Sequence, residues 1–145
     1  MNTLYKNIRL KQHDHHTGWF FITNKTNFGK DLLKDKAYDL AKQELYTHVE
    51  KTNGVSLDYG VFMPNHVHII LIFNNAALHL SEFWRRYKAV TTLKLKRAGL
   101  IKESLWQRNY FEHVIRTEKA LFRIREYIKH NPYKENVPLR EIYEP

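Results

Sequence analysis

The stretch that decides the fold is residues 61–73, VFMPNHVHIILIF, which is the longest apolar run in the chain. Its second half is rich in Val, Ile and Phe, which predicts a buried strand over residues 66–73, opened by a turn at Pro64. Alternate side chains of a strand share a face, so His66 and His68 point the same way, about 7 Å apart along the backbone. Two imidazoles so placed can bind one metal ion, or they can be core histidines that hydrogen-bond elsewhere.

The composition indicates a single basic domain. The chain has 145 residues, of which 43% are hydrophobic and 14% aromatic, enough for a proper core. It contains no cysteine, which excludes disulfides and cysteine–zinc sites. Its net charge of +9 favours a polyanionic partner, with nucleic acid ahead of a membrane surface, although a generally basic surface is the alternative. Because no leader-like or membrane-spanning run is evident, we expect a cytoplasmic protein without a membrane partner.

The order of the predicted elements indicates an α+β fold. Runs of apolar, aromatic and β-branched residues predict strands over 18–23, 55–62, 66–73 and 111–116. Apolar residues at steps of three and four predict helices over 31–51, 78–98 and 118–130. A βαββαβ order makes a ferredoxin-like four-stranded antiparallel sheet with two helices on one face. The histidine strand is then central, and the last helix is an addition that is free to pack near the histidines.

This order also predicts the domain organisation. One domain covers residues 18–132, between a polar N-terminal segment over residues 1–17 and a C-terminal tail over residues 133–145. Thr117 is placed to cap the final helix, and Pro132 is placed to stop it.

Cations and aromatic side chains suggest where nucleic acid could bind. The predicted helix over 78–98 carries many more basic than acidic residues, which makes it a candidate surface for the phosphate backbone. A solvated helix face is the alternative for each cation, and core packing is the alternative for a tryptophan. The candidate DNA-binding residues are Arg85, Arg86, Lys88, Trp106 and Arg116.

Two polar side chains of the final helix could complete a site with the histidines. Tyr127 and Asn131 are four residues apart and therefore share a face of the helix. A helical tyrosine is often a core residue with its hydroxyl at the edge, and an asparagine before proline is a common helix terminus.

The motifs MPNHVH at 63–68, WQ at 106–107, VIR at 114–116 and YIKHNP at 127–132 together resemble the single-tyrosine HUH transposases, which include the REP-associated tyrosine transposases and share the IS200-like transposase domain. The resemblance spans residues 19–132. It implies a ferredoxin-like fold with an appended catalytic helix, in which His66, His68 and Asn131 bind a divalent cation, Mg²⁺ or Mn²⁺. It further implies that Tyr127 is the nucleophile.

The resemblance also predicts the reaction and the partners. The family cleaves and rejoins single-stranded DNA through a 5′-phosphotyrosine intermediate. The expected partners are therefore single-stranded DNA with hairpin or repeat elements and a second copy of the chain in a homodimer, and the expected location is the nucleoid of a bacterial cytoplasm.

Two other functions remain open at the level of sequence. A ferredoxin-like sheet can bind nucleic acid without cutting it, and an H-x-H pair can belong to a small zinc hydrolase. Binding modules of this kind usually carry paired aromatic residues on the central strands, whereas this strand carries His66 and His68. Only the transposase interpretation requires Tyr127 and Asn131.

Overall fold

The computed structural model describes residues 15–131. Within this range the chain forms four strands, three α-helices and one short 3-10 turn. The segments in chain order are β1 (Gly18–Lys25), η1 (Asn27–Gly29), α2 (Asp35–Lys51), β2 (Val55–Met63), β3 (His66–Phe73), α3 (Leu80–Arg97), β4 (Phe111–Val114) and α4 (Glu118–His130). The predicted N-terminal segment, apart from residues 15–17, and the predicted tail at 133–145 lie outside the described residues.

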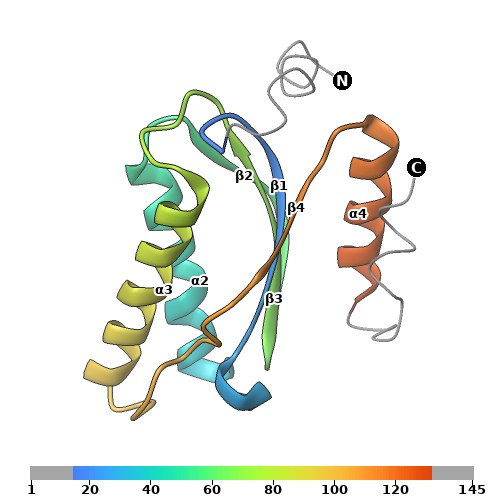
Figure 1. Ribbon diagram of the computed structural model, residues 1–145. Coiled ribbons are helices and arrows are strands. Elements are labelled where there is room, and N and C mark those ends of the chain that lie inside the picture. Colours follow the sequence, from blue (N-terminus) through green and yellow to red (C-terminus); the bar gives the residue numbers. More distant parts are fainter. Residues whose placement is uncertain (1–14, 132–145) are drawn as a thin grey trace.

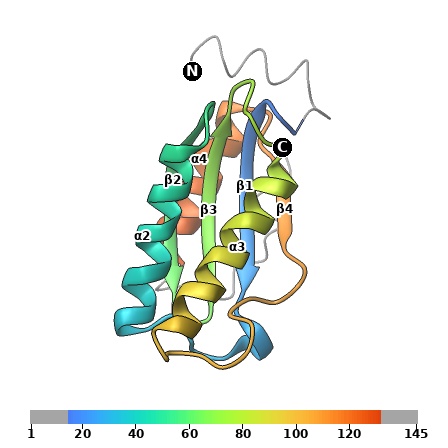
Figure 2. The same ribbon diagram turned by 90° about the vertical axis from the view of Figure 1, so that its left-hand side faces the viewer.

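The sheet has the ferredoxin-like order β2-β3-β1-β4, and each neighbouring pair is antiparallel. The predicted fold class is therefore confirmed, with the first and third strands at the centre. Helices α2 and α3 cover one face of the sheet, while α4 covers the other (Figures 1 and 2). The histidine strand thus lies between two different layers.

Alternation along β3 assigns its side chains to these two layers. Val67, Ile69 and Leu71 are buried in the main core beneath α2 and α3. Ile70, on the opposite face, belongs to a smaller apolar cluster beneath α4, together with Phe21 of β1 and other residues of the same layer. A strand has a side-chain period of two, so the same strand serves both cores.

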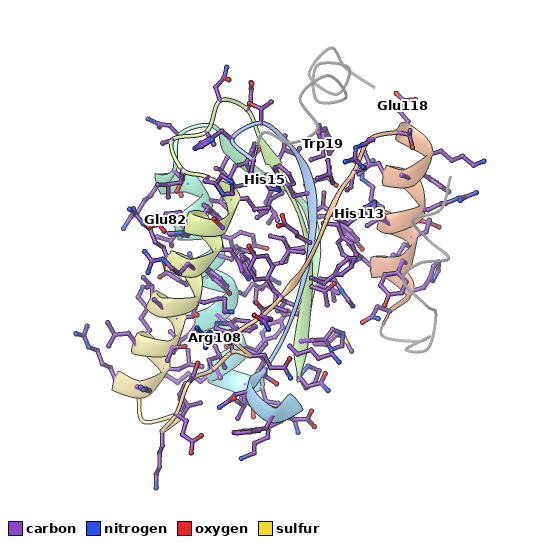
Figure 3. All side chains as sticks on the ribbon, in the orientation of Figure 1. His15, Trp19, Glu82, Arg108, His113 and Glu118 are labelled. Atoms are coloured by element: carbon purple, nitrogen blue, oxygen red, sulfur yellow. The ribbon has the colours of Figure 1, made fainter. Side chains whose placement is uncertain are left out.

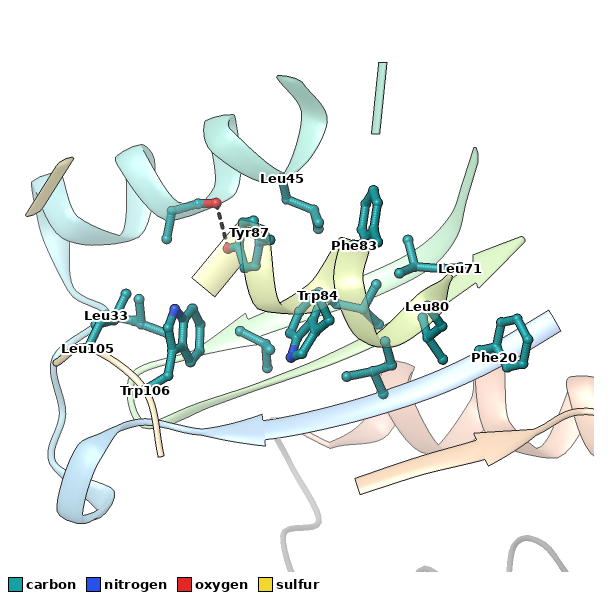
Figure 4. Packing of buried hydrophobic residues seen from close by; sticks show 14 of the residues in the cluster. Phe20, Leu33, Leu45, Leu71, Leu80, Phe83, Trp84, Tyr87, Leu105 and Trp106 are labelled. Carbon is teal, nitrogen blue, oxygen red and sulfur yellow. Dashed lines mark hydrogen bonds between the residues drawn. The ribbon is translucent and has the colours of Figure 1, made fainter. Parts of the chain in front are cut away.

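Polar atoms of large aromatic residues are satisfied inside the main core, part of which is shown in Figure 4. The hydroxyl of Tyr87 donates to the carbonyl of Ala41 over 2.8 Å. Trp84 donates its indole N–H to Asn24 Oδ1 over 2.8 Å. These bonds remove the cost of burying polar groups and fix α3 relative to both α2 and β1.

Helix α2 begins at Asp35, four residues later than predicted. Leu33 fits the apolar period of the helix and is buried, but the segment before Asp35 is not helical. The backbone N–H of Leu33 instead donates to the carbonyl of Pro64 over 2.9 Å. A tertiary hydrogen bond to the turn before β3 therefore replaces the first helical turn.

The fourth strand is also shorter than predicted, since it ends at Val114. Ile115 still donates its N–H to the carbonyl of Trp19 over 2.8 Å, after which the chain leaves the sheet for α4. Thr117 accepts a hydrogen bond from the N–H of Ala120, as its predicted role as a cap requires. Across residues 15–131, none of the helices is both long enough and apolar enough to cross a membrane.

Candidate active site

The two histidines of β3 lie side by side on the face of the sheet that α4 covers. The centroids of the His66 and His68 rings are 4.7 Å apart. His68 is 3% exposed, while His66 at the end of the strand is only partly buried. The shared face predicted from the strand period is therefore what the structure shows.

Helix α4 brings Tyr127 and Asn131 of the same chain to these histidines. The ring centroids of Tyr127 and His68 are 5.2 Å apart, and Asn131 Oδ1 lies 3.1 Å from His66 Nε2. Asn131 is 2% exposed although it stands at the C-cap of the helix. The four residues predicted from the sequence thus meet in one place, and all four belong to one protomer.

Neighbouring side chains fix the orientation of both imidazoles. His66 Nδ1 lies 2.7 Å from Asn65 Oδ1, and His68 Nδ1 lies 2.7 Å from Thr23 Oγ1. Burial, with a smaller contribution from His66, lowers the pKa of His68 to about 3. His68 is therefore neutral at pH 7 and has a nitrogen lone pair to offer.

The Asn131 amide connects the phenol to the histidine pair. Burial raises the pKa of Tyr127 above its usual value, and a hydrogen bond from Asn131 opposes that rise. An amide that donates its N–H to the phenol must turn its Oδ1 elsewhere, and here Oδ1 faces His66 Nε2.

The distance between His66 Nε2 and Asn131 Oδ1 indicates whether a divalent cation could fit between them. When Nδ1–H of a neutral His66 donates to Asn65, Nε2 and the Asn131 oxygen both present lone pairs across 3.1 Å. Two ligand atoms at right angles on an octahedral ion, with bonds of about 2.0–2.1 Å, lie about 2.9 Å apart. In this tautomer, the spacing of the two atoms is compatible with an ion that both of them hold.

No cluster of three or more His, Cys, Asp or Glu side chains able to hold a metal occurs among residues 15–131. The Asn131 amide, whose Oδ1 lies 3.1 Å from His66 Nε2, stays the predicted third ligand beside His66 and His68. An amide oxygen suits Mg²⁺ and Mn²⁺, and three protein ligands leave coordination positions open, unlike a closed zinc site with four.

These residues line a cavity of about 520 Å³. Sequence analysis missed two charged members of its lining, Lys25 and Asp31. Lys25 follows Thr23 on the same face of β1 and stands opposite His66 in the strand register, so the strand period was an available signal. Asp31 had no such signal, because its position depends on the nonhelical segment before α2. The lining residues are Thr23, Lys25, Asp31, Met63, Pro64, Asn65, His66, His68, Tyr127 and Asn131.

The predicted DNA-binding cations of α3 lie elsewhere. Arg85 and Arg86 both bond to Glu82, at 2.7 Å and 3.0 Å. Figure 3 shows Glu82 on the outer side of α3, with the sheet between it and α4. The basic face of α3 is therefore on the far side of the sheet from the cavity, and DNA contacts by Arg85 and Arg86 stay a prediction. Arg116, also exposed, lies between β4 and α4, and its role likewise stays a prediction.

Two of the candidate DNA-binding side chains, Trp106 and Lys88, form hydrogen bonds within the protein. Trp106 is 2% exposed and donates its indole N–H to Thr91 Oγ1, so neither ring face is open to a base. The ammonium of Lys88 donates to the carbonyls of Gln107 and Arg108, over 2.7 Å and 3.0 Å. Partial burial lowers the pKa of Lys88 to about 8. Both side chains hold the segment after α3 in place. Trp106 is thus a core residue, whereas Lys88 is only partly buried and its contact with DNA stays a prediction.

The protein is an α+β protein with a ferredoxin-like sheet. A histidine pair on a central strand of this sheet faces a tyrosine on an added helix. The family model described as Transposase IS200 like matches residues 13–131. The chain belongs to this IS200-like transposase family.

Similar proteins agree with this assignment. An uncharacterised protein of Haemophilus influenzae is 30% identical, over 88% of this chain and 87% of its own length. The REP-associated tyrosine transposase of Escherichia coli K12 is 28% identical, over 80% of this chain and 66% of its own length.

Two solved structures share the fold. A REP-associated tyrosine transposase bound to a REP hairpin superposes with a TM-score of 0.68 at 24% identity, covering 84% of this chain and 70% of the other. A candidate transposase from Deinococcus radiodurans R1 gives a TM-score of 0.61 at 20% identity, covering 79% and 90% of the two chains.

Proposed function

We propose that the protein is a metal-dependent transposase that cleaves and rejoins single-stranded DNA through a 5′-phosphotyrosine intermediate. The observation that carries this proposal is the position of Tyr127, whose ring lies 5.2 Å from His68 in a cavity that His66 and Asn131 also line. A phenol beside two imidazoles and an amide can supply both the nucleophile and the metal ligands for phosphodiester transesterification.

His66, His68 and Asn131 would hold the divalent cation, Mg²⁺ or Mn²⁺. When bound, the cation supplies electrophilic polarisation of the scissile phosphodiester. All three ligands are neutral, so the positive charge that faces the substrate stays largely uncancelled. Asn65 and Thr23 contribute by fixing the imidazole rings before the ion arrives.

Tyr127 would attack the phosphorus atom through its hydroxyl oxygen. One bond forms between this oxygen and phosphorus, the bond from phosphorus to the 3′-oxygen breaks, and the departing oxygen takes a proton to become a free 3′-hydroxyl. The phenol is protonated at neutral pH, because burial raises its pKa, and it must give up this proton during attack. A phosphodiester replaces a phosphodiester, so attack by a 3′-hydroxyl can rejoin strands without ATP.

The substrate class follows from charge and from the relatives. The chain has a net charge of +9, and a solved structure with the same fold holds a REP hairpin. We therefore infer that the substrate is single-stranded DNA with hairpin-forming repeats, acted on at the nucleoid in a bacterial cytoplasm. A homodimer remains a prediction, and it is not needed to bring Tyr127 to the histidines.

The direct test is covalent capture of DNA. Hairpin-bearing single-stranded DNA labelled at its 3′ end is incubated with the protein and Mn²⁺, because a 5′-phosphotyrosine link keeps the 3′-terminal fragment on the protein. We expect a labelled adduct that survives denaturing electrophoresis and requires the divalent cation. Tight DNA binding without any adduct would instead support a nucleic-acid-binding module.

Replacing Lys25 with glutamine should weaken DNA binding in the absence of metal. Of the residues between 15 and 131 that line the cavity, Lys25 is the only lysine or arginine, and it stands opposite His66 in the register. Loss of one phosphate contact should make the plot of log affinity against log salt shallower by about 0.7. Fluorescence anisotropy at several salt concentrations measures this slope, and Lys30→Gln, whose side chain is outside the cavity lining, is the control. An unchanged slope in Lys25→Gln would remove Lys25 from the binding surface.

A further inference from the structure

An ion pair joins α4 to β2, the edge strand that lies next to the histidine strand β3. Arg125 donates through Nε to Asp58 Oδ2 over 2.9 Å and through its terminal NH2 group to Asp58 Oδ1 over 2.6 Å. The Asp58 side chain is 12% exposed and that of Arg125 is 43% exposed. A bidentate pair of this kind fixes direction as well as distance.

Asp58 lies at an irregularity in β2. Leu57 stands opposite Leu71 and Tyr59 stands opposite Ile70, so Asp58 is an extra residue without a partner on β3. Asp58 therefore makes no strand pair at this position, and its side chain bonds to α4 instead.

The active site depends on how α4 sits on the sheet. The helix supplies Tyr127 and Asn131, whereas β3 supplies the two histidines. Apolar contacts hold α4 down, but packing of this kind is nondirectional and tolerates small sliding movements. A slide of one residue moves a helix by about 1.5 Å, which is enough to open the contact between Asn131 and His66.

We propose that Asp58 and Arg125 are a positioning pair that sets the placement of α4, and with it the placement of Tyr127 and Asn131 against the histidines. Arg125 precedes Tyr127 by two residues and lies on the side of the helix that faces β2. It does not line the cavity, so its effect on the site would come through the position of α4. The catalytic consequence rests on the proposed function, whereas the effect on α4 itself does not.

The test uses two variants that disturb the pair with little change in volume. Arg125→Lys removes the two-pronged geometry but keeps the charge, and Asp58→Asn removes the charge but keeps the shape. With saturating DNA and Mn²⁺, we expect each to slow single-turnover adduct formation at least about tenfold. Their DNA affinity without metal should remain within about twofold of the wild-type value, because neither residue lines the cavity. The exchanged double variant Asp58→Arg/Arg125→Asp should recover part of the rate.

A second readout does not depend on catalysis. Hydrogen exchange without DNA or metal should become faster at the backbone amides of α4 in both variants, while those of β1 and β3 keep their protection. Lys129→Gln, an exposed change on the same helix, is the control and should alter neither readout. If wild-type protein forms no adduct, the proposed function fails, but the exchange measurement still decides whether the pair positions α4.

The positioning role would be overturned by folded variants that keep the wild-type adduct rate and the wild-type exchange of α4. It would also be overturned if exchange increased equally in β1, β3 and α4. That pattern would mean that the pair only adds to global stability.

Discussion

Tyr127→Phe should lower adduct formation by at least about a thousandfold, because the substitution removes the attacking oxygen. The ring that remains can still pack against Phe21 and His68, whose ring centroids lie 6.4 Å and 5.2 Å from that of Tyr127. We therefore expect a folded variant that binds hairpin DNA with an affinity within about threefold of wild type. The measurement is the fraction of 3′-labelled DNA attached to protein after denaturation.

Tyr110→Phe is the matched control for this experiment. The ring of Tyr110 packs near Trp84 and beneath the ammonium of Lys88, outside the lining of the active-site cavity. Its adduct yield should equal that of the wild type. An adduct that persists in Tyr127→Phe but disappears in Tyr110→Phe would transfer the nucleophile to Tyr110. Persistence in both variants would direct attention to Tyr133, outside the described residues.

The parts of the fold that the sequence predicted well are those specified by local signals. The bounds of β3 and α4 agree with the prediction at both ends. A continuous β-branched run after a turn defines the strand, while a threonine cap and a following proline define the helix. Tyr127 and Asn131 share one face of α4, and the two histidines share one face of β3. Packing these two faces together is enough to bring all four side chains into one site.

The features that sequence analysis missed are set by contacts between distant segments. The nonhelical start before α2 depends on a hydrogen bond from Leu33 to Pro64. Core packing of Trp106 was the alternative that sequence analysis left open against DNA binding, and its contact with Thr91 of α3 decides between the two. The pairing of Asp58 with Arg125 joins residues 67 positions apart and depends on how α4 packs across β2.

His66→Ala should abolish metal-dependent cleavage while DNA binding without metal remains. Removing a residue that only hydrogen-bonds to a metal ligand typically weakens metal binding by roughly tenfold to hundredfold. If His66 is itself a ligand, its loss should weaken Mn²⁺ binding by more than this. His66 is only partly buried at the end of β3, so the variant should fold. Mn²⁺ titration followed by electron paramagnetic resonance of the free ion measures affinity without DNA, and the adduct assay measures cleavage.

His130→Ala is the control for this substitution, because His130 is exposed on α4 and does not line the cavity. It should leave Mn²⁺ affinity and adduct yield unchanged. Asn131→Ala should reproduce the loss of Mn²⁺ affinity, since its Oδ1 faces His66 Nε2 across 3.1 Å. The interpretation of His66 and His68 as core histidines predicts a different pattern. His66→Ala would then lower the thermal midpoint of unfolding, while metal affinity and the amount of adduct per folded molecule would stay at the wild-type level.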